Sequence, residues 1–337
     1  MAKLTTNLKV LLLNTENLFL LSDQKLTAEH LNLDEAQWKR LSTSIYENKP
    51  LIKTKALAQA IKKHNPDILM LIEVGGLESL QNFNKLFLDD AYSPALIEGN
   101  SDRHIDVGFL VRKNIGFYFD VVSNKNRPIN FLYSREREAA QNNPKAIQSH
   151  KFSRDAAELH LFTKDREKPF MIFVLAHLKS RLDPDNVDPG GFERRQAELK
   201  TLIEIYQELE AKHHNIPICV SGDLNGRAAI NQPDTEFKLI YEKTLLKDVG
   251  DLAQLPEDQR ATYYQIGRNS KPEGKQLDYC FLNPKLAELL NTQSVLVHRY
   301  EDHLGLPFDP PTTLDAKTNL PSDHYPLIFE IQNLVLT

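Results

Sequence analysis

The sequence predicts an α/β fold in which mixed β-sheets are covered by helices. Short apolar runs, the pattern typical of buried strands, recur along the chain, and two amphipathic stretches have the spacing of helices. The two kinds of element interleave without strict strand–helix repetition, which favours mixed sheets over a regular parallel sheet.

The N-terminal half begins with a strand, a helix and a second strand. Residues 9–13 (KVLLL) form a short apolar run that suits a buried strand. Residues 52–64 carry apolar side chains on one helical stripe. Residues 67–72 (DILMLI) predict another buried strand, introduced by the turn pair Asn65-Pro66. Further strands are expected at residues 105–111, 117–122, 156–162 and 170–176.

The C-terminal half has one long helix among strands. Residues 192–211 are amphipathic, with Leu199, Leu202 and Leu209 among the apolar positions. The next strand is expected at 216–221, directly before Gly222. Residues 305–321 contain LPFDPPTT and predict a long loop before the last strand. The remaining strands are expected at residues 276–282, 294–297 and 325–331.

The length of 337 residues permits one large domain or two ordinary ones. Residues 22–50 are polar and hold Trp38, the only tryptophan, whereas residues 123–153 are rich in Arg, Asn and Lys. Both segments look like surface insertions and not like linkers between domains. Because we find no internal repeat and no low-complexity tract, we expect a single domain over residues 1–337 that carries these two insertions.

The composition is that of an ordinary globular protein. Hydrophobic residues make up 41% and charged residues 26%, which allows a normal buried core. The net charge of −5 speaks against a protein held on nucleic acid by bulk charge alone. A nuclease is not excluded, because a local basic cleft would be enough.

The sequence also predicts a reducing compartment. Cys219 and Cys280 lie inside apolar runs, so we expect buried free thiols and no disulfide framework. The first residues lack the cleavage site of a secretory signal, and no apolar stretch approaches the ~20 residues that span a membrane. We therefore expect a soluble, cytoplasmic protein with no membrane span and no obligate protein partner.

The residues that can carry chemistry lie where predicted strands end. In open α/β sheets, ligand sites gather beyond the carboxyl ends of strands, so we expect these side chains to share one crevice. Taken singly, each residue is more simply explained as a turn or a cap. Their joint occurrence along the whole chain is hard to explain in that way. The residues are Asn14, Glu16, Glu73, His177, Asp223, Asn225, Asp278, Asp323 and His324.

The residue types favour a hard divalent cation. Mg²⁺ takes carboxylate and amide oxygens and keeps several waters, and Asn14, Glu16, Glu73 and Asp323 can supply such ligands, with Mn²⁺ as the alternative ion. Zinc would favour clustered His and Cys, and no HExxH motif is present. The sequence also lacks a Walker motif, GxGxxG and GxSxG.

Six motifs, in this order, resemble the endonuclease/exonuclease/phosphatase (deoxyribonuclease I-like) superfamily: NTENLF, LIEV, AHLKS, SGDLN, LDY and SDH. The resemblance covers residues 10–331. It implies one catalytic domain with a four-layer α/β/β/α sandwich, in which two central mixed sheets are flanked by helices. It also implies a metal-dependent hydrolase of phosphate esters.

The resemblance assigns roles to the metal-site residues. It makes Asn14 and Glu73 residues of the metal site, and Glu16 a supporting or alternate ligand. Asp323 would orient a metal-bound group or bind the metal through water.

The resemblance also assigns the catalytic residues. Asp223 and Asn225 would hold the attacking water and a phosphate oxygen. His324 would contact the phosphate, with Asp278 orienting and polarising it. His177 matches the histidine of the deoxyribonuclease and sphingomyelinase branches, which the apurinic endonuclease branch lacks.

Two basic residues are expected to bind substrate. Arg154, in FSRD, resembles an arginine that some members use near the substrate phosphate, and Lys179 would add positive charge to the cleft. We expect His324 to pair with Asp278, whereas His177, without such a partner, should titrate closer to its ordinary value. Which histidine acts as the acid stays open, and so does the base, for which the Asp278–His324 pair is the alternative to Asp223.

The expected reaction is in-line attack of water on phosphorus, assisted by the metal. The favoured substrate is nucleic acid, cleaved by endonuclease or exonuclease action. The alternative is a phosphatase or phosphodiesterase acting on a small molecule or a lipid head group. A catalytically silent binding protein is disfavoured because every key polar position is filled. A basic face formed by Lys125, Arg127, Arg135, Arg137 and Lys145 would favour nucleic acid.

Overall fold

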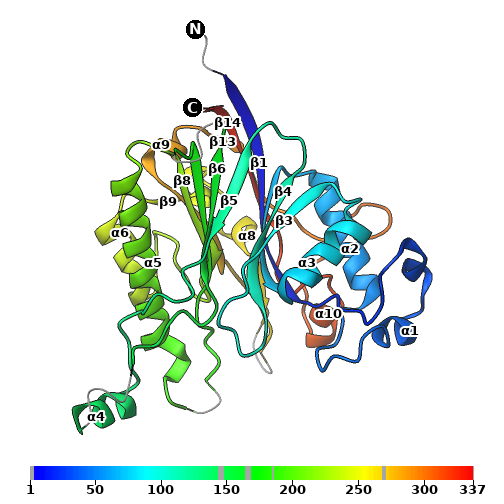
Figure 1. The fold of residues 1–337 in the computed structure, drawn as a ribbon, viewed down its shortest axis with the longest axis horizontal. Coiled ribbons are helices and arrows are strands. Elements are labelled where there is room, and N and C mark those ends of the chain that lie inside the picture. Colours follow the sequence, from blue (N-terminus) through cyan, green and yellow to red (C-terminus); the bar gives the residue numbers. More distant parts are fainter. Residues whose placement is uncertain (1–3, 143–147, 164–167, 184–185, 268–270, 337) are drawn as a thin grey trace.

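Two six-stranded sheets lie face to face in the centre of the molecule (Figure 1). The computed structural model describes residues 4–142, 148–163, 168–183, 186–267 and 271–336. Within these ranges, no helix is both long enough and apolar enough to cross a membrane. The first sheet has the order β13 (Leu290–Val297), β14 (Leu327–Val335), β1 (Thr5–Leu18), β2 (Ile68–Val74), β4 (Asp106–Arg112) and β3 (Tyr92–Ala95). The second has the order β5 (Tyr118–Val122), β6 (Ala156–Phe162), β7 (Met171–His177), β8 (Ile218–Asp223), β12 (Asp278–Leu282) and β9 (Lys247–Asp248).

The central strands are buried on both faces, which is why they are nearly continuous apolar runs. Along β1, Val10 and Leu12 join the core between the sheets, while Leu11 and Leu13 join the core beneath the outer helices. This alternation is the period of two that a β-strand imposes on its side chains. The inner core therefore fills the space between the two sheets along the middle of these strands.

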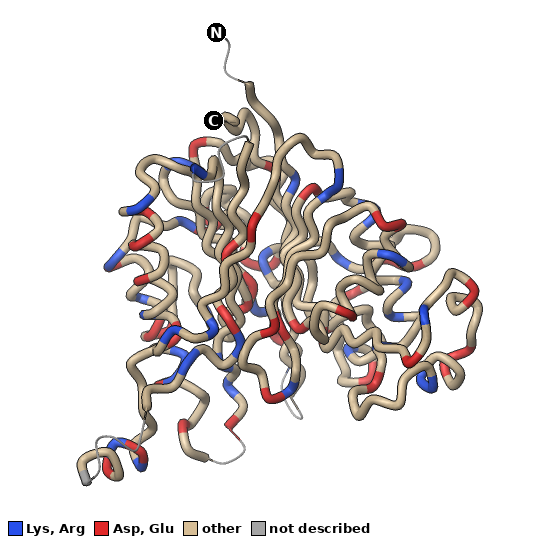
Figure 2. The backbone as a smooth tube through the Cα atoms, viewed as in Figure 1, with Lys and Arg blue, Asp and Glu red and all other residues tan. Residues whose placement is uncertain are grey.

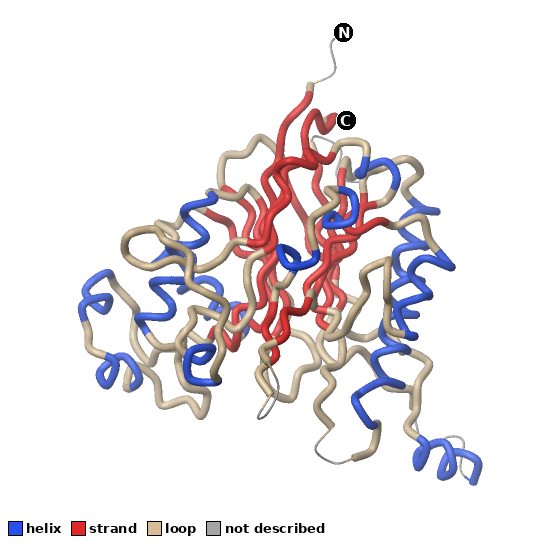
Figure 3. Tube along the Cα trace, turned by 180° about the vertical axis from the view of Figure 1, so that it is seen from behind, coloured by secondary structure: helices blue, strands red, loops and turns tan. Residues whose placement is uncertain are grey.

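Helices cover the outer face of each sheet, so that the strands form a middle layer (Figure 3). The first sheet is covered by α2 (Leu51–His64) and α3 (Gly76–Phe87). The second is covered by α5 (Phe192–Lys212) and α6 (Lys238–Lys243). The predicted α/β/β/α sandwich is therefore confirmed.

The remaining elements are short and lie at the margins of the sandwich. A separate two-stranded hairpin, β10 with β11, stands beside the two large sheets. The short elements are η1 (Ala28–Asn32), α1 (Glu35–Lys39), α4 (Ser134–Asn142), η2 (Pro189–Gly191), η3 (Thr235–Phe237), α7 (Val249–Leu252), α8 (Glu257–Arg260), β10 (Tyr263–Gln265), β11 (Glu273–Lys275), α9 (Pro284–Ala287) and α10 (Leu314–Thr318).

Every strand that the sequence predicted is present, with ends shifted by a few residues. Helix α3 was missed, although Leu80, Phe83 and Phe87 have helical spacing and are buried against the first sheet. Strand β3 was also missed, because its four residues, YSPA, include a proline and lack an apolar run. Cys219 and Cys280 are buried and free, as expected.

The segment 22–50 is fastened to the sandwich by its tryptophan. Trp38 is fully buried, and its ring meets Phe87 of α3 at a centroid distance of 6.0 Å. Its indole N–H donates to the carbonyl of Lys49 at 2.9 Å. The other expected insertion, residues 123–153, carries α4, which projects away from the body of the molecule (Figure 1).

This anchor leads to a stability prediction. Trp38→Ala should lower the free energy of unfolding by about 3–5 kcal/mol, because it removes a buried ring and leaves a cavity. Ile45→Ala, in the same segment but 88% exposed, should change it by less than about 0.5 kcal/mol. Denaturant unfolding of both variants checks the expectation. Equal losses would show that Trp38 does not anchor the segment.

Candidate functional site

The site forms at the end of the inner core. There, polar side chains occupy the positions of the strands that face the opposite sheet. On β1, Val10 and Leu12 face the second sheet, and the next position in this series is Asn14. On β7, Phe173 and Leu175 are followed in the same way by His177. The polar residues are therefore directed into the space between the sheets by strand periodicity alone.

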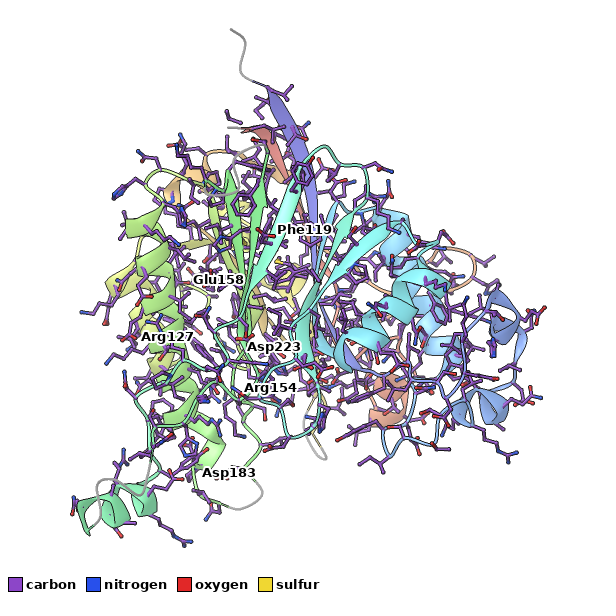
Figure 4. The ribbon with its side chains drawn as sticks, viewed as in Figure 1. Phe119, Arg127, Arg154, Glu158, Asp183 and Asp223 are labelled. Atoms are coloured by element: carbon purple, nitrogen blue, oxygen red, sulfur yellow. The ribbon has the colours of Figure 1, made fainter. Side chains whose placement is uncertain are left out.

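Three of these residues form one row across the second sheet. His177 is the register partner of Asp223, and Asp223 is the register partner of Asp278. Because register partners share a face, their side chains meet between the sheets. In Figure 4, Asp223 and Arg154 lie near each other at the lower ends of the central strands.

The expectation that all site residues follow carboxyl ends of strands was wrong for three of them. Asp278 is the first residue of β12, and Asp323 and His324 precede β14. Both strands run antiparallel to their neighbours, β8 and β1. Their amino ends therefore reach the same edge as the carboxyl ends of the parallel strands.

A cleft of about 1080 Å³ opens at this edge. Most of the predicted residues line it, although up to 310 positions separate them in the sequence (324 − 14). Asp278 lies directly behind His324 and is fully buried. The predicted residues among those lining the cleft are Asn14, Glu16, Glu73, Arg154, His177, Asp223, Asn225, Asp323 and His324.

Asp223 is the most heavily supported carboxylate of the site. Its Oδ2 accepts a hydrogen bond from the Asn14 side-chain amide at 3.1 Å, and its Oδ1 accepts one from the Asn225 backbone N–H at 2.8 Å. Burial, together with the negative charge of Asp278, raises the pKa of Asp223 to about 7. Such a carboxylate can accept a proton near neutral pH.

His324 stands between two carboxylates. Its Nδ1 lies 2.7 Å from Asp278 Oδ2, which is the expected pairing, and its Nε2 lies 3.8 Å from Asp223 Oδ2. Burial alone would lower the pKa of His324, but the charges of Asp278 and Asp223 outweigh it and raise this pKa well above its ordinary value. The imidazole is therefore held in its charged form, with Nε2 directed towards the cleft.

The expectation for His177 was wrong. Its Nε2 lies 3.9 Å from Glu73 Oε1 and 3.8 Å from Asp223 Oδ2, too far for hydrogen bonds, and its Nδ1 is buried without a partner among the described residues. Burial, followed by the positive charge of Arg154, lowers the pKa of His177 well below its ordinary value. The sequence predicted that His177 has no carboxylate partner, but it did not predict that the imidazole is buried, which is the main cause of the lowered pKa.

The acidic residues at the mouth of the site differ in their partners. The carboxylate of Glu16 faces two ammonium groups, those of Lys49 at 3.4 Å and Lys53 at 3.2 Å. Asp323 pairs with Lys317 at 3.3 Å. Glu73 accepts a hydrogen bond from the Asn17 backbone N–H at 3.2 Å but has no Lys or Arg partner among the described residues.

Two of these acidic residues adopt a strained backbone. Glu16 has φ +52° and Glu73 has φ +60°, in the left-handed region that favours glycine. The pairing between β2 and β4 is irregular between Ile72 and Val74. This irregularity breaks the alternation of β2 at Glu73, whose side chain would otherwise follow Leu69 and Leu71 towards the outer helices. Strain of this kind tends to persist at functional sites.

The two predicted substrate-binding cations lie in different surroundings. Arg154 is only 7% exposed and lines the cleft; its guanidinium donates to Ser153 Oγ and pairs with no carboxylate in the described chain. The ammonium of Lys179 instead donates to the carbonyl oxygens of Ser180 and Leu182, and Lys179 is not among the residues lining the cleft.

Sequence reasoning missed five residues that complete the site. Arg103 lines the cleft and donates to Asn17 Oδ1 at 2.6 Å. The others are Lys49 in the expected insertion, Lys53 in the predicted helix, Lys317 in the predicted loop, and Tyr263 in a stretch for which no element was predicted. No motif marks them, because Lys49, Lys53 and Tyr263 meet the site only through long-range folding and Lys317 lies six positions before Asp323, outside SDH.

Comparisons with known proteins identify the fold. No protein-family model matches the sequence, and no curated protein matches it. Among solved structures, an endonuclease/exonuclease/phosphatase family protein from Bacteroides thetaiotaomicron shares 16% identity at a TM-score of 0.54, over 98% of this chain and 99% of that one. A mannosyl-6-phosphatase of the same organism shares 17% identity at a TM-score of 0.52, over 96% and 98%.

A third similar structure is TDP2 from D. rerio, complexed with single strand DNA product. It shares 14% identity at a TM-score of 0.55, over 96% of this chain and 98% of that one. These likenesses show that the chain has the fold of the endonuclease/exonuclease/phosphatase superfamily, as the six motifs predicted.

The close approach of β7 and β8 at the site predicts a specific role for Gly222. A Cβ at Gly222 would lie 1.9 Å from the carbonyl oxygen of Ala176, and its φ is +152°. Gly116 also has positive φ, +88°, but has open space around it. Gly116→Ala should cost about 1–3 kcal/mol through strain, and Gly222→Ala about 1–3 kcal/mol more through the clash. Denaturant unfolding measures both, and equal losses would contradict the close-approach argument.

Proposed function

We propose that this chain is a divalent-metal-dependent phosphoesterase. One observation carries the proposal: the cleft leaves an acidic and a basic group without charged partners. Glu73 has no Lys or Arg partner and Arg154 has no carboxylate within ion-pair distance among the described residues, whereas most other charged residues of the cleft are paired. A divalent cation bound to a phosphate would satisfy both groups at once.

The residues at the cleft fit a hard cation. The carboxylate of Glu73 and the side-chain amide of Asn14 offer oxygen ligands beside Asp223, and few protein ligands are needed because Mg²⁺ keeps waters and takes substrate oxygens. Mn²⁺ would suit the same oxygens. Glu16 and Asp323, whose carboxylates are paired with lysines, would support the metal site and not bind the ion as its main ligands. When bound, the ion neutralises charge on the phosphoryl and leaving oxygens.

Asp223, Asp278 and His324 could also be considered as a metal site, because one ligand atom from each lies within 4.8 Å of the others. The 2.7 Å hydrogen bond between His324 Nδ1 and Asp278 Oδ2 already joins two of these three residues to each other. We therefore assign this group to proton handling and not to metal binding.

The protein groups would then divide the reaction between them. Asp223, with Asn225 beside it, orients the attacking water and accepts its proton. Charged His324, held by Asp278, stabilises the developing charge at Nε2 or donates a proton there. Arg154 binds a non-bridging phosphate oxygen. Neutral His177 offers Nε2 to the same space and contributes a hydrogen bond without adding charge.

We propose a single catalytic domain over residues 1–337, with insertions at 22–50 and 123–153, of which residues 143–147 lie outside the described chain. The two buried free thiols support a reducing, cytoplasmic location.

Nucleic acid is the first substrate class that we propose, with cleavage of a phosphodiester bond. Arg103 and Arg154 both line the cleft, and Arg103 also pairs with no carboxylate in the described chain, so the two can bind neighbouring phosphates. The similarity to a TDP2 structure that contains single strand DNA product supports this choice at the level of the fold.

A second candidate, a phosphatase of small phosphate esters, is favoured by the pairing of the remaining basic residues. Arg181, Arg260 and Lys317 of the cleft each have a carboxylate partner. Acidic and basic residues are interspersed over the fold (Figure 2). The similarity to a mannosyl-6-phosphatase fits this candidate.

The expected basic face is also largely neutralised. Arg127 pairs with Glu208, and Arg137 pairs with Glu193. Lys125 donates to the Glu98 carbonyl, Arg135 does not line the cleft, and Lys145 lies outside the described residues.

A hydrolysis screen with Mg²⁺ tests the proposal. Plasmid DNA, single-stranded DNA, RNA, bis-p-nitrophenyl phosphate and inositol phosphates are the substrates, and a chelator should abolish turnover. Glu73→Gln should raise the Mg²⁺ concentration needed for half-maximal rate by at least about tenfold, because it removes a charged ligand. Glu16→Gln, whose carboxylate is already neutralised by two lysines, should have a smaller effect. Chelator-resistant turnover, or a larger effect of Glu16→Gln, would contradict the assignment.

A second kinetic test concerns the pair of His324 and Asp278. His324→Ala should lower kcat by ~10²–10⁴-fold, the usual loss for a general acid–base group. Asp278→Asn should have a similar effect, and the double variant should be little worse than the worse single one, because the two act as a unit. Fully multiplicative losses would show independent action.

A further inference from the structure

Tyr263 contacts the catalytic histidine and a buried lysine with the same ring. Its ring centroid lies 5.1 Å from that of His324, at an interplanar angle of 54°. Lys317 Nζ lies over the ring, 3.4 Å from its centroid. Tyr263 also lines the cleft, and its hydroxyl makes no hydrogen bond within the described chain. The aromatic face, not the hydroxyl, therefore makes its contacts.

The backbone around Tyr263 fixes where this ring lies. Tyr263 forms an isolated antiparallel bridge with His324, and the Thr262 carbonyl accepts a hydrogen bond from the Tyr325 N–H at 2.8 Å. Thr262 Oγ1 accepts one from the Asp278 N–H at 3.2 Å. Residues 262–263 are thus hydrogen-bonded both to the segment that carries Asp278 and to the segment that carries His324.

Lys317 extends the arrangement to Asp323. The ammonium is 3.3 Å from Asp323 Oδ2, and Asp323 Oδ1 is 3.9 Å from His324 Nε2. Lys317 is 9% exposed, so the side chain is largely shielded from water. A cation is attracted to the negative face of an aromatic ring, and this attraction is stronger where water is excluded. The ring therefore limits where the ammonium can lie, and with it the carboxylate of Asp323.

We propose that Tyr263 is a positioning residue, which holds the imidazole of His324 directly and the carboxylate of Asp323 through Lys317. The proposal rests on the proposed function, because it assumes that His324 and Asp323 act on a phosphate in the cleft. It assigns the role to the ring alone. A phenylalanine at position 263 should therefore keep this positioning role, whereas an aliphatic side chain should lose it.

The test compares Tyr263→Leu with Tyr263→Phe and with a matched control on the next residue. Tyr264 is 8% exposed and is not among the cleft-lining residues, and its ring holds the Arg299 guanidinium at 5.1 Å. Tyr264→Leu is thus the same chemical change, and it removes a similar cation–ring contact together with the hydrogen bond that Arg299 donates to the Tyr264 hydroxyl. It shows what the loss of a buried tyrosine does when the ring does not contact His324 or Lys317.

Tyr263→Leu should lower kcat by about 10²-fold, as expected for a misplaced catalytic group, with KM changed by less than about threefold. Tyr263→Phe should stay within about threefold of the unmodified protein. Tyr264→Leu should lower the Tm at least as much as Tyr263→Leu while leaving kcat within the same limit. Lys317→Met combined with Tyr263→Leu should be little worse than the worse single variant, because both act on Asp323.

A second readout does not depend on turnover. The proton between His324 Nδ1 and Asp278 should give a far-downfield NMR signal, assigned by its loss in His324→Gln. This signal should persist in Tyr263→Phe and Tyr264→Leu. It should broaden in Tyr263→Leu, because the imidazole is then less restrained and its Nδ1 proton exchanges faster with water.

Several results would overturn the inference. They are an unchanged signal and kcat in Tyr263→Leu, equal impairment in Tyr263→Phe, or an equal loss of kcat in Tyr264→Leu. If the unmodified protein hydrolyses no substrate of the screen, the proposed function fails. The NMR comparison then still decides whether Tyr263 holds the imidazole.

Discussion

The hydrogen bond between Asn14 and Asp223 joins the two sheets at the functional edge. Asn14 belongs to β1 of the first sheet and Asp223 to β8 of the second, and their side chains meet at 3.1 Å. The Asn14 carbonyl in turn accepts a hydrogen bond from Ser322 Oγ at 2.7 Å. A buried carboxylate needs such donors, because an unpaired one is costly. This bond joins the two sheets at the edge where the cleft opens.

The charges of the cleft are arranged so that most of them cancel. Lysines face Glu16 and Asp323, and His324 lies between Asp223 and Asp278. A group of like-charged carboxylates could not otherwise be buried together. Glu73 and Arg154 are left without an ion-pair partner among the described residues, and so is Arg103. A cation and an anion bound together would complete the balance.

The second layer of the site comes from segments that look unremarkable in the sequence. Lys49 ends the polar segment 22–50, and burial, opposed by Glu16, lowers its pKa to about 8. Lys317 belongs to a five-residue helix within a proline-rich loop, and Tyr263 to a three-residue strand. Lys49 and Tyr263 reach the site across large sequence distances, whereas Lys317 lies six positions before Asp323, and each acts on a residue that a motif had already marked.

The sequence by itself determined most strands of the two sheets, the helices α2 and α5 and the residues of the six motifs, but not β3 or α3. Burial on both faces makes strands such as KVLLL continuous apolar runs, and the chemistry of the site requires particular residue types at their ends. Only the tertiary structure decided that Asp278 and His324 arrive from antiparallel strands, that His177 is kept neutral, and that Lys49, Lys317 and Tyr263 support the site. Periodicity is a local property that each segment carries, whereas pKa values and charge pairs depend on which segments meet. These contacts between segments are set by the packing of the two sheets and not by any one stretch of the chain.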